Sequence, residues 1–247
     1  MTVHETAAAG YRVAGADYER ARPDYPQEVL GILVEELGVG RTTTAVELGA
    51  GTGKFTRMLV QEVGLLVATE PVAAMRGELA AAVATPVVAA AAEAVPLGAA
   101  SVDLVVAATA FHWFRGREAL AEAHRVLRPG GGLALVWNNP DRRCDWVARI
   151  WGMVDEHRGD TPGNRDQRWR EAFTGDTGFT PLTSRHLSHR ARMSVDDLVT
   201  RVGSISFIAS LEPDEKESFL ATVRAVVAGQ DEVELPYVTE VHWCRRR

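Results

Sequence analysis

The sequence predicts an α/β protein organised around a mainly parallel β-sheet. Short apolar runs rich in β-branched residues alternate with segments whose apolar residues recur at helical spacing, the pattern of right-handed βαβ units. A glycine-rich turn at 49–53 joins a strand pattern to a helical pattern. The 247 residues, 46% of them hydrophobic, suffice for one large domain with a substantial core.

The elements of the first half of the chain follow from these periodicities. Pro26 suits the first turn of the first helix, and Gly38 suits its end. Apolar runs that end at polar or turn residues predict strands over 42–46, 65–69, 86–89, 102–107 and 133–137. Helical spacing predicts helices over 26–37, 55–63, 72–84 and 117–127.

The pattern changes after residue 138, where helices outnumber strands. Ser194 and Asp197 have the spacing of a helix N-terminal cap. We expect helices over 141–158, 165–173, 194–202 and 213–228, with a loop at 159–163. We expect long strands over 179–192 and 232–244.

Glu47 precedes the glycine turn in the pattern E-x-G-x-G-x-G. Glycines let backbone approach a ligand closely, and the helix start that follows offers free N–H groups. A P-loop is excluded because Leu48 and Phe55 replace its glycine and hydroxyl residue. A dinucleotide fingerprint would place its third glycine one residue after Gly53. A carboxylate at position 47 can instead pair with a ligand ammonium group.

Four residues far apart in the sequence stand at the carboxyl ends of predicted strands. Ligands of parallel sheets bind outside these ends, so we expect the four to converge on one site. Glu70 can accept hydrogen bonds from both hydroxyls of a ribose, which suits a nucleoside-containing cofactor. The four residues are Glu47, Glu70, Ala107 and Trp137.

The composition excludes several classes of function. A net charge of −6 and the lack of a long basic run argue against nucleic acid as a partner. No apolar run is long enough to span a membrane, and residues 1–5 lack a signal-peptide layout, so we expect a cytoplasmic protein. Cys144 and Cys244 are isolated, so we expect neither a disulfide framework nor a metal site.

The glycine motif, 46–53, resembles motif I of class I S-adenosylmethionine (SAM) methyltransferases. Residues 111–114 and the Tyr18-x-x-Ala21-Arg22-Pro23 segment are similar to the methyltransferase type 11 subgroup that includes trans-aconitate methyltransferase. Other matching stretches are 92–97, 101–106 and 122–131, and the resemblance covers 18–137. It implies a Rossmann-like, seven-stranded, mainly parallel sheet with helices on both faces, an antiparallel last strand, and SAM as cofactor.

The resemblance also implies roles for individual residues. His112 is the candidate general base, and Trp113 is the candidate aromatic face beside the cationic methyl group; structural roles for both are the alternatives. Asn138 would orient a polar group of the acceptor. The expected cofactor-binding residues are Tyr18, Arg22, Glu47, Gly49, Ala50, Gly51, Thr52, Gly53, Glu70, Pro71, Met75, Ala92, Glu93, Ala107, Ala108 and Thr109. Ala91 stands where the family often places an adenine-binding Asp.

We therefore expect one methyltransferase domain acting on a small organic acceptor through a carboxylate, hydroxyl, amine or carbon atom, in a biosynthetic pathway. Two alternatives stay open: a SAM-binding cyclase or isomerase of the same fold, and, less favoured, an NAD-dependent oxidoreductase. We expect a monomer or homodimer. The expected parts are a helical cover at 1–40, a SAM-binding core at 41–138, a substrate lid at 139–178, and C-terminal strands and helices at 179–247.

Overall fold

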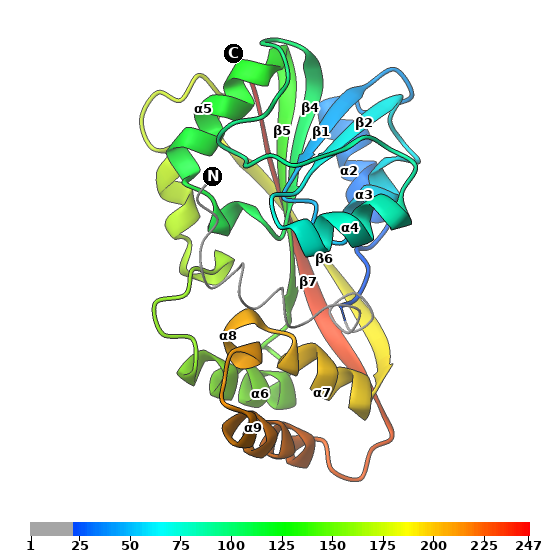
Figure 1. Cartoon of the computed structure of the whole chain (residues 1–247), viewed down its shortest axis with the longest axis vertical. Helices are drawn as coiled ribbons and strands as arrows, with labels where there is room; N and C mark the ends of the chain where they lie inside the picture. The colour runs from blue at the N-terminus through cyan, green and yellow to red at the C-terminus, as the bar shows by residue number, and fades with distance from the viewer. Residues whose placement is uncertain (1–21) are drawn as a thin grey trace.

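A single seven-stranded sheet runs through the computed structural model, which describes residues 22–247 (Figure 1). The strand order is β3-β2-β1-β4-β5-β7-β6. The strands are β1 (Thr44–Leu48), β2 (Leu65–Thr69), β3 (Val87–Val88), β4 (Val102–Ala108), β5 (Leu127–Pro140), β6 (Thr183–Ser194) and β7 (Glu232–Arg245).

Strand β7 is the antiparallel member of the sheet. The pairs β1–β2, β1–β4, β2–β3 and β4–β5 are parallel, whereas β7 runs antiparallel to both of its neighbours, β5 and β6. The predicted fold class, including its antiparallel last strand, is confirmed. The parallel arrangement brings the carboxyl ends of β1, β2 and β4 to one edge of the sheet.

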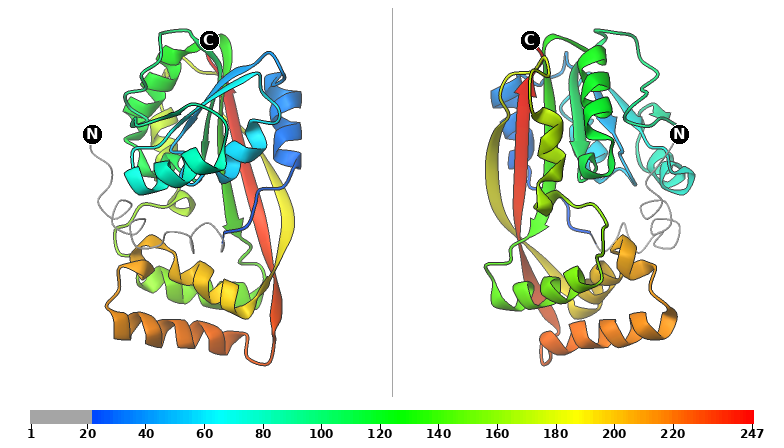
Figure 2. Two further views of the ribbon diagram at one scale, coloured as in Figure 1. Left: turned by 45° about the vertical axis from the view of Figure 1, so that its right-hand side comes forward. Right: turned by 90° about the vertical axis from the view of Figure 1, so that its left-hand side faces the viewer.

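Helices cover both faces of the sheet (Figure 2). One face packs against α2 (Glu28–Leu37) and α3 (Lys54–Leu59), and the other against α5 (Gly116–Val126). Side chains of β1 alternate between the two faces: Ala45 packs in the core with α2 and α3, whereas Val46 and Leu48 pack in the core with α5. Helix α4 (Ala73–Ala82) packs Leu79 beside the glycine turn.

Strands β5, β6 and β7 extend beyond the ends of the other four strands. A separate group of helices packs against this extension, at the bottom of Figure 1. We call it the α6–α9 cluster: α6 (Asp145–Glu156), α7 (Val195–Gly203), α8 (Ser206–Ala209) and α9 (Pro213–Val226). It has its own apolar core, which includes Trp151, Leu198 and Val223, and the distal part of β7 contributes Leu235 and Tyr237. Strand β5 is correspondingly longer than the predicted 133–137.

The segment expected to be a lid, 139–178, divides between two places. Helix α6 joins the α6–α9 cluster, whereas the short 3-10 helices η2 (Asn164–Asp166) and η3 (Arg168–Phe173) follow separately, and η3 packs against α5. Trp169 of η3 is buried in the same core as α5. The sequence periodicity predicted the helices in 145–156 and 195–226, but it did not indicate that they pack together in one cluster.

Gly64 lies directly before β2, and its N–H donates to the carbonyl of Thr43, directly before β1, at 3.0 Å. This hydrogen bond joins the starts of the two strands. A Cβ at Gly64 would lie 2.2 Å from the Arg41 carbonyl oxygen. We predict that Gly64→Ala lowers the free energy of unfolding by about 1–3 kcal/mol, since backbone must move. Gly40→Ala is the control, because nothing lies within 4 Å of its Cβ position. Equal urea midpoints for the two variants would contradict this account.

Candidate functional site

A large pocket opens at the carboxyl ends of β1, β2 and β4, with a volume of about 1150 Å³ that includes its open mouth. This is the position at which parallel α/β sheets bind ligands. The predicted site residues that line it are Arg22, Glu47, Gly49, Ala50, Gly51, Thr52, Glu70, Pro71, Met75, Ala92, Glu93, Ala108, Thr109 and Trp113.

Three of the predicted residues that the structure describes do not line the pocket. Gly53 instead caps the N-terminus of α3 with φ 94°, and the Ala107 side chain is buried in the core behind β4. His112 lines a separate cavity beside η3. Tyr18 lies outside the described residues.

Other lining residues come from segments without a motif. Tyr25 and Lys54 flank the pocket near the glycine turn, and Asn138, two residues before the end of β5, also lines it. Arg201 reaches the pocket from α7, about 150 residues beyond the glycine turn in the sequence. Nothing local to Arg201 could have identified it among the many arginines of this chain. The remaining lining residues are Pro23, Phe55, Val72, Ala91, Ala110 and Phe114.

Glu47 places a buried carboxylate in the pocket wall. The residue is 1% exposed, and no group within residues 22–247 hydrogen-bonds to its Oε2 atom. The pKa of Glu47 is raised to about 8, mainly by burial; the Thr56 hydroxyl opposes this rise, and the nearby Glu70 carboxylate makes the smallest, upward contribution. A buried acceptor of this kind is costly unless a donor reaches it. A cationic donor would satisfy both the hydrogen bond and the charge.

Glu70 joins the end of β2 to the glycine turn. Its Oε2 accepts a hydrogen bond from Gly51 N at 2.9 Å, and its Oε1 accepts one from Val72 N at 2.8 Å. Burial raises the pKa of Glu70, whereas these two backbone hydrogen bonds act in the opposite direction. Gly49 and Gly51 take φ values of 65° and 60°, which bend the turn around the carboxylate. Each carboxylate oxygen keeps a lone pair for a ligand hydroxyl.

Polar side chains on the other strand ends are held by hydrogen bonds. The Tyr25 hydroxyl lies 2.8 Å from Thr109 Oγ1. The backbone of Thr109 itself has a positive φ of 51°. Asn138 Oδ1 accepts a hydrogen bond from the Thr239 hydroxyl at 2.9 Å, and Asn138 Nδ2 donates to the Asp24 carbonyl at 3.3 Å. These two contacts fix the orientation of the Asn138 side-chain amide.

The aromatic run after β4 divides between the core and the pocket. Phe111 is buried and packs edge to face with Phe114, their ring centroids 5.7 Å apart. Trp113 and Phe114 both line the pocket. The Phe114 ring also lies over the glycine turn, since a Cβ at Gly49 would come within 3.2 Å of it. A 3-10 turn, η1 (Phe111–Trp113), produces this division.

The structure corrects the expectation that His112 is a general base. Trp137 Nε1, which can only donate, lies 3.0 Å from His112 Nδ1, so the neutral ring carries its proton on Nε2. The pKa of His112 is lowered to about 3, mainly by burial and in part by the charge of Arg22. His112 therefore stays neutral near pH 7, its basic nitrogen is occupied, and it lies outside the pocket.

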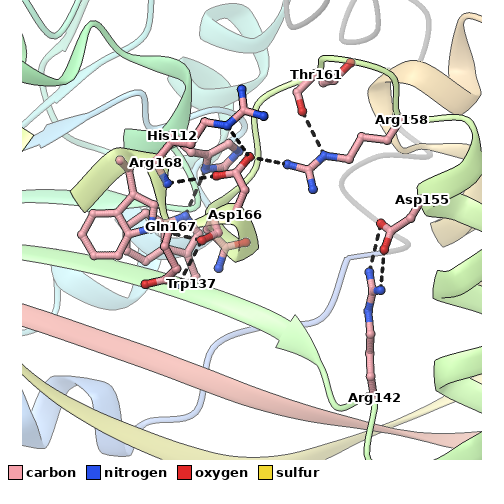
Figure 3. A network of polar contacts seen from close by, with 11 residues as sticks. His112, Trp137, Arg142, Asp155, Arg158, Thr161, Asp166, Gln167 and Arg168 are labelled. Carbon is pink, nitrogen blue, oxygen red and sulfur yellow. Dashed lines mark hydrogen bonds and ion pairs between the residues drawn. The ribbon is translucent and has the colours of Figure 1, made fainter. Parts of the chain in front are cut away.

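The surroundings of His112 form a polar network that connects the β5 end to the segment after α6 (Figure 3). Asp166 accepts a hydrogen bond from Arg158 Nη2 at 2.8 Å and another from Arg168 N at 3.1 Å. Farther along, Arg142 pairs with Asp155 of α6 through two hydrogen bonds of 2.5 and 3.1 Å. The network holds η2 and α6 in fixed positions beside the sheet.

Residues 22–247 contain no group of three His, Cys, Asp or Glu side chains placed to hold a metal ion. None of the helices described is long and apolar enough to cross a membrane.

Comparison with known proteins gives consistent similarities. The methyltransferase domain family matches residues 46–135. An uncharacterized methyltransferase-like protein of Schizosaccharomyces pombe is 36% identical over 234 residues, covering 91% of this chain and 90% of the relative. An uncharacterized methyltransferase of Mycobacterium bovis is 33% identical over 229 residues, covering 90% of this chain and 89% of the relative.

Solved structures show the same fold. A type II methyltransferase structure from Anaeromyxobacter dehalogenans has a TM-score of 0.66 at 23% identity, covering 91% of this chain and 96% of that one. Geranyl diphosphate C-methyltransferase from Streptomyces coelicolor, solved with S-adenosyl-L-homocysteine, has a TM-score of 0.51 at 15% identity, covering 88% and 78%. Both belong to the Rossmann-like methyltransferase architecture.

The low pKa of His112 predicts a pH-dependent loss of stability. Between its unfolded pKa near 6.5 and its folded pKa of about 3, only the unfolded chain binds the proton, so stability falls as pH drops through this range. His112→Asn keeps an acceptor for Trp137 but does not titrate. Between pH 6.5 and 4.5 the wild type should lose about 2 kcal/mol more unfolding free energy than this variant. Parallel losses in urea titrations would refute the assignment.

A second prediction concerns Glu70. Glu70→Gln leaves one oxygen for two backbone N–H groups and directs an NH₂ group at the other, so we expect a loss of about 1–3 kcal/mol in unfolding free energy. Glu93→Gln is the matched control, because Glu93 accepts only one such bond, from Arg115 N at 2.8 Å. Glu93→Gln should change stability by less than about 0.5 kcal/mol. Comparable losses in thermal unfolding would show that Glu70 does not join β2 to the glycine turn.

Proposed function

The chain belongs to the methyltransferase domain family, and on that premise we propose that it transfers a methyl group from SAM to a small organic acceptor. The observation that carries the proposal is the buried Glu47 carboxylate, whose Oε2 faces no partner within residues 22–247. SAM carries an ammonium group on its methionine part. That group would supply both the hydrogen bond and the positive charge that Glu47 lacks.

The rest of the pocket wall fits the adenosine part. Glu70 would accept hydrogen bonds from ribose hydroxyls with the lone pairs left over from Gly51 N and Val72 N. Met75 and Ala92 offer apolar surface for a nucleobase. The left-handed glycines of the turn let backbone lie close to the ligand.

SAM supplies a methyl group already activated on a sulfonium. The electron pair of the acceptor atom forms the new bond to the methyl carbon as the carbon–sulfur bond breaks and its pair passes to sulfur. The protein then has to align the acceptor, exclude water and accommodate positive charge. The aromatic faces of Trp113 and Phe114 suit a cation, and the amide of Asn138 would orient the acceptor.

The direct test is product analysis. Incubation with SAM and a panel of small acceptors should yield S-adenosylhomocysteine and a product heavier by one methylene, in equal amounts. A product of unchanged mass would favour the cyclase or isomerase alternative. Binding of NAD without any binding of SAM would refute the proposal.

The proposal also predicts how affinity depends on pH. Because the pKa of Glu47 is about 8 in the free protein, its carboxyl group must lose a proton to pair with an ammonium. Affinity for S-adenosylhomocysteine should therefore rise up to about tenfold per pH unit from pH 5.5 to 7. Glu47→Gln should remove this dependence and weaken binding by roughly 2–3 kcal/mol at pH 8. Calorimetry with an unchanged affinity and pH dependence in the variant would place Glu47 outside the site.

A further inference from the structure

The pocket is lined by charges of opposite sign that come from different parts of the fold. The carboxylates of Glu47 and Glu70 come from the ends of β1 and β2. The cations Arg22, Lys54 and Arg201 line other parts of the wall. A SAM molecule presents its ammonium and ribose to the acidic part. The basic part therefore faces the remainder of the methionine moiety and the acceptor.

Lys54 and Arg22 come from the N-terminal part of the described chain and line the pocket near its glycine turn and β1. Lys54 stands at the start of α3, directly after the glycine turn, and its Nζ lies 3.1 Å from Asp24 Oδ1. Arg22 lies two residues before Asp24 in the chain. Its charge, like that of Arg158, lowers the pKa of His112.

Arg201 is different because it comes from the α6–α9 cluster. Among the described residues it is the one member of that cluster that lines the pocket. Its side chain is 6% exposed, and its neighbours Leu198 and Val202 are fully buried in the core of the cluster. Packing therefore fixes the Arg201 guanidinium at the pocket wall, where its planar donors can bind a carboxylate through two hydrogen bonds.

We propose that Arg201 is a specificity-determining residue that binds an anionic group of the acceptor, and that this anion is not the atom that receives the methyl group. The inference rests on the proposed methyl transfer. It assigns the acceptor to small organic acids that carry a second functional group. The position of Arg201 on α7 gives the α6–α9 cluster a role in selecting the acceptor.

The separation of the anchored anion from the methylated atom follows from charge. An attacking oxygen or nitrogen becomes less negative as its electron pair forms the bond to carbon. A guanidinium bonded to that atom would stabilise the ground state more than the transition state and slow the reaction. The same guanidinium on a second anionic group binds both states equally and orients the acceptor.

The test compares matched acceptors. Hydroxy, amino and dicarboxylic acids are each paired with the neutral amide of one carboxyl group, and S-adenosylhomocysteine formation is measured with wild type, Arg201→Met, Arg201→Lys and Arg190→Met. Arg190 is the control, since it is an exposed arginine of β6 paired with Glu234 at 3.0 Å. SAM affinity of every variant is measured by calorimetry and reports the proposed function separately.

The wild type and Arg190→Met should use at least one acid and prefer it to its amide by tenfold or more. Arg201→Met should lower kcat/KM for that acid roughly 10- to 100-fold and abolish the preference, with SAM affinity within about twofold of wild type. Arg201→Lys should retain part of the preference. The inference is overturned if SAM binds but no acid is methylated, if amides serve equally well, or if Arg201→Met keeps the preference. If SAM does not bind the wild type, the proposed function fails first.

Discussion

The buried carboxylate of Glu47 is the constraint on which the rest of the site depends. Burial at the end of β1 raises the pKa of Glu47. Within the described residues no donor hydrogen-bonds to its Oε2. Replacing it with an apolar residue would fill the same space without that cost. The proposed cationic ligand accounts for its position, because an ammonium group would supply both the missing hydrogen bond and the opposite charge. Folding places this unsatisfied group at the edge of the sheet where β1, β2 and β4 end.

The surrounding structure holds that edge in shape. Glu70 bridges two backbone N–H groups on different segments, and the glycines take the left-handed conformations that the bridge requires. On the acceptor side, the amide of Asn138 is oriented by Thr239, and the η1 turn directs Trp113 and Phe114 toward the pocket while burying Phe111. The α6–α9 cluster contributes Arg201 to the pocket wall, and under our proposal acceptor recognition depends on this element outside the sheet.

Local patterns predicted most of the fold and the cofactor side of the pocket. Strand periodicity and the glycine spacing are local signals that predicted Glu47 and Glu70 at neighbouring strand ends, and both residues line one pocket. His112 was misread because its behaviour depends on Trp137, Arg22 and burial, all of which are tertiary. Arg201 was missed because only the packing of α7 distinguishes it from other arginines. The α6–α9 cluster likewise depends on long-range contacts between helices far apart in sequence.

The central claim is that Glu47 stays uncompensated until an ammonium group reaches it. A carbon-13 NMR titration of the Glu47 carboxyl, with and without S-adenosylhomocysteine, tests this most directly. The account predicts a pKa of about 8 in the free protein. It predicts a pKa of about 4 or lower in the complex, because a bound ammonium stabilises the ionised form. An unchanged pKa in the complex, or an ordinary value near 4 in the free protein, would contradict it.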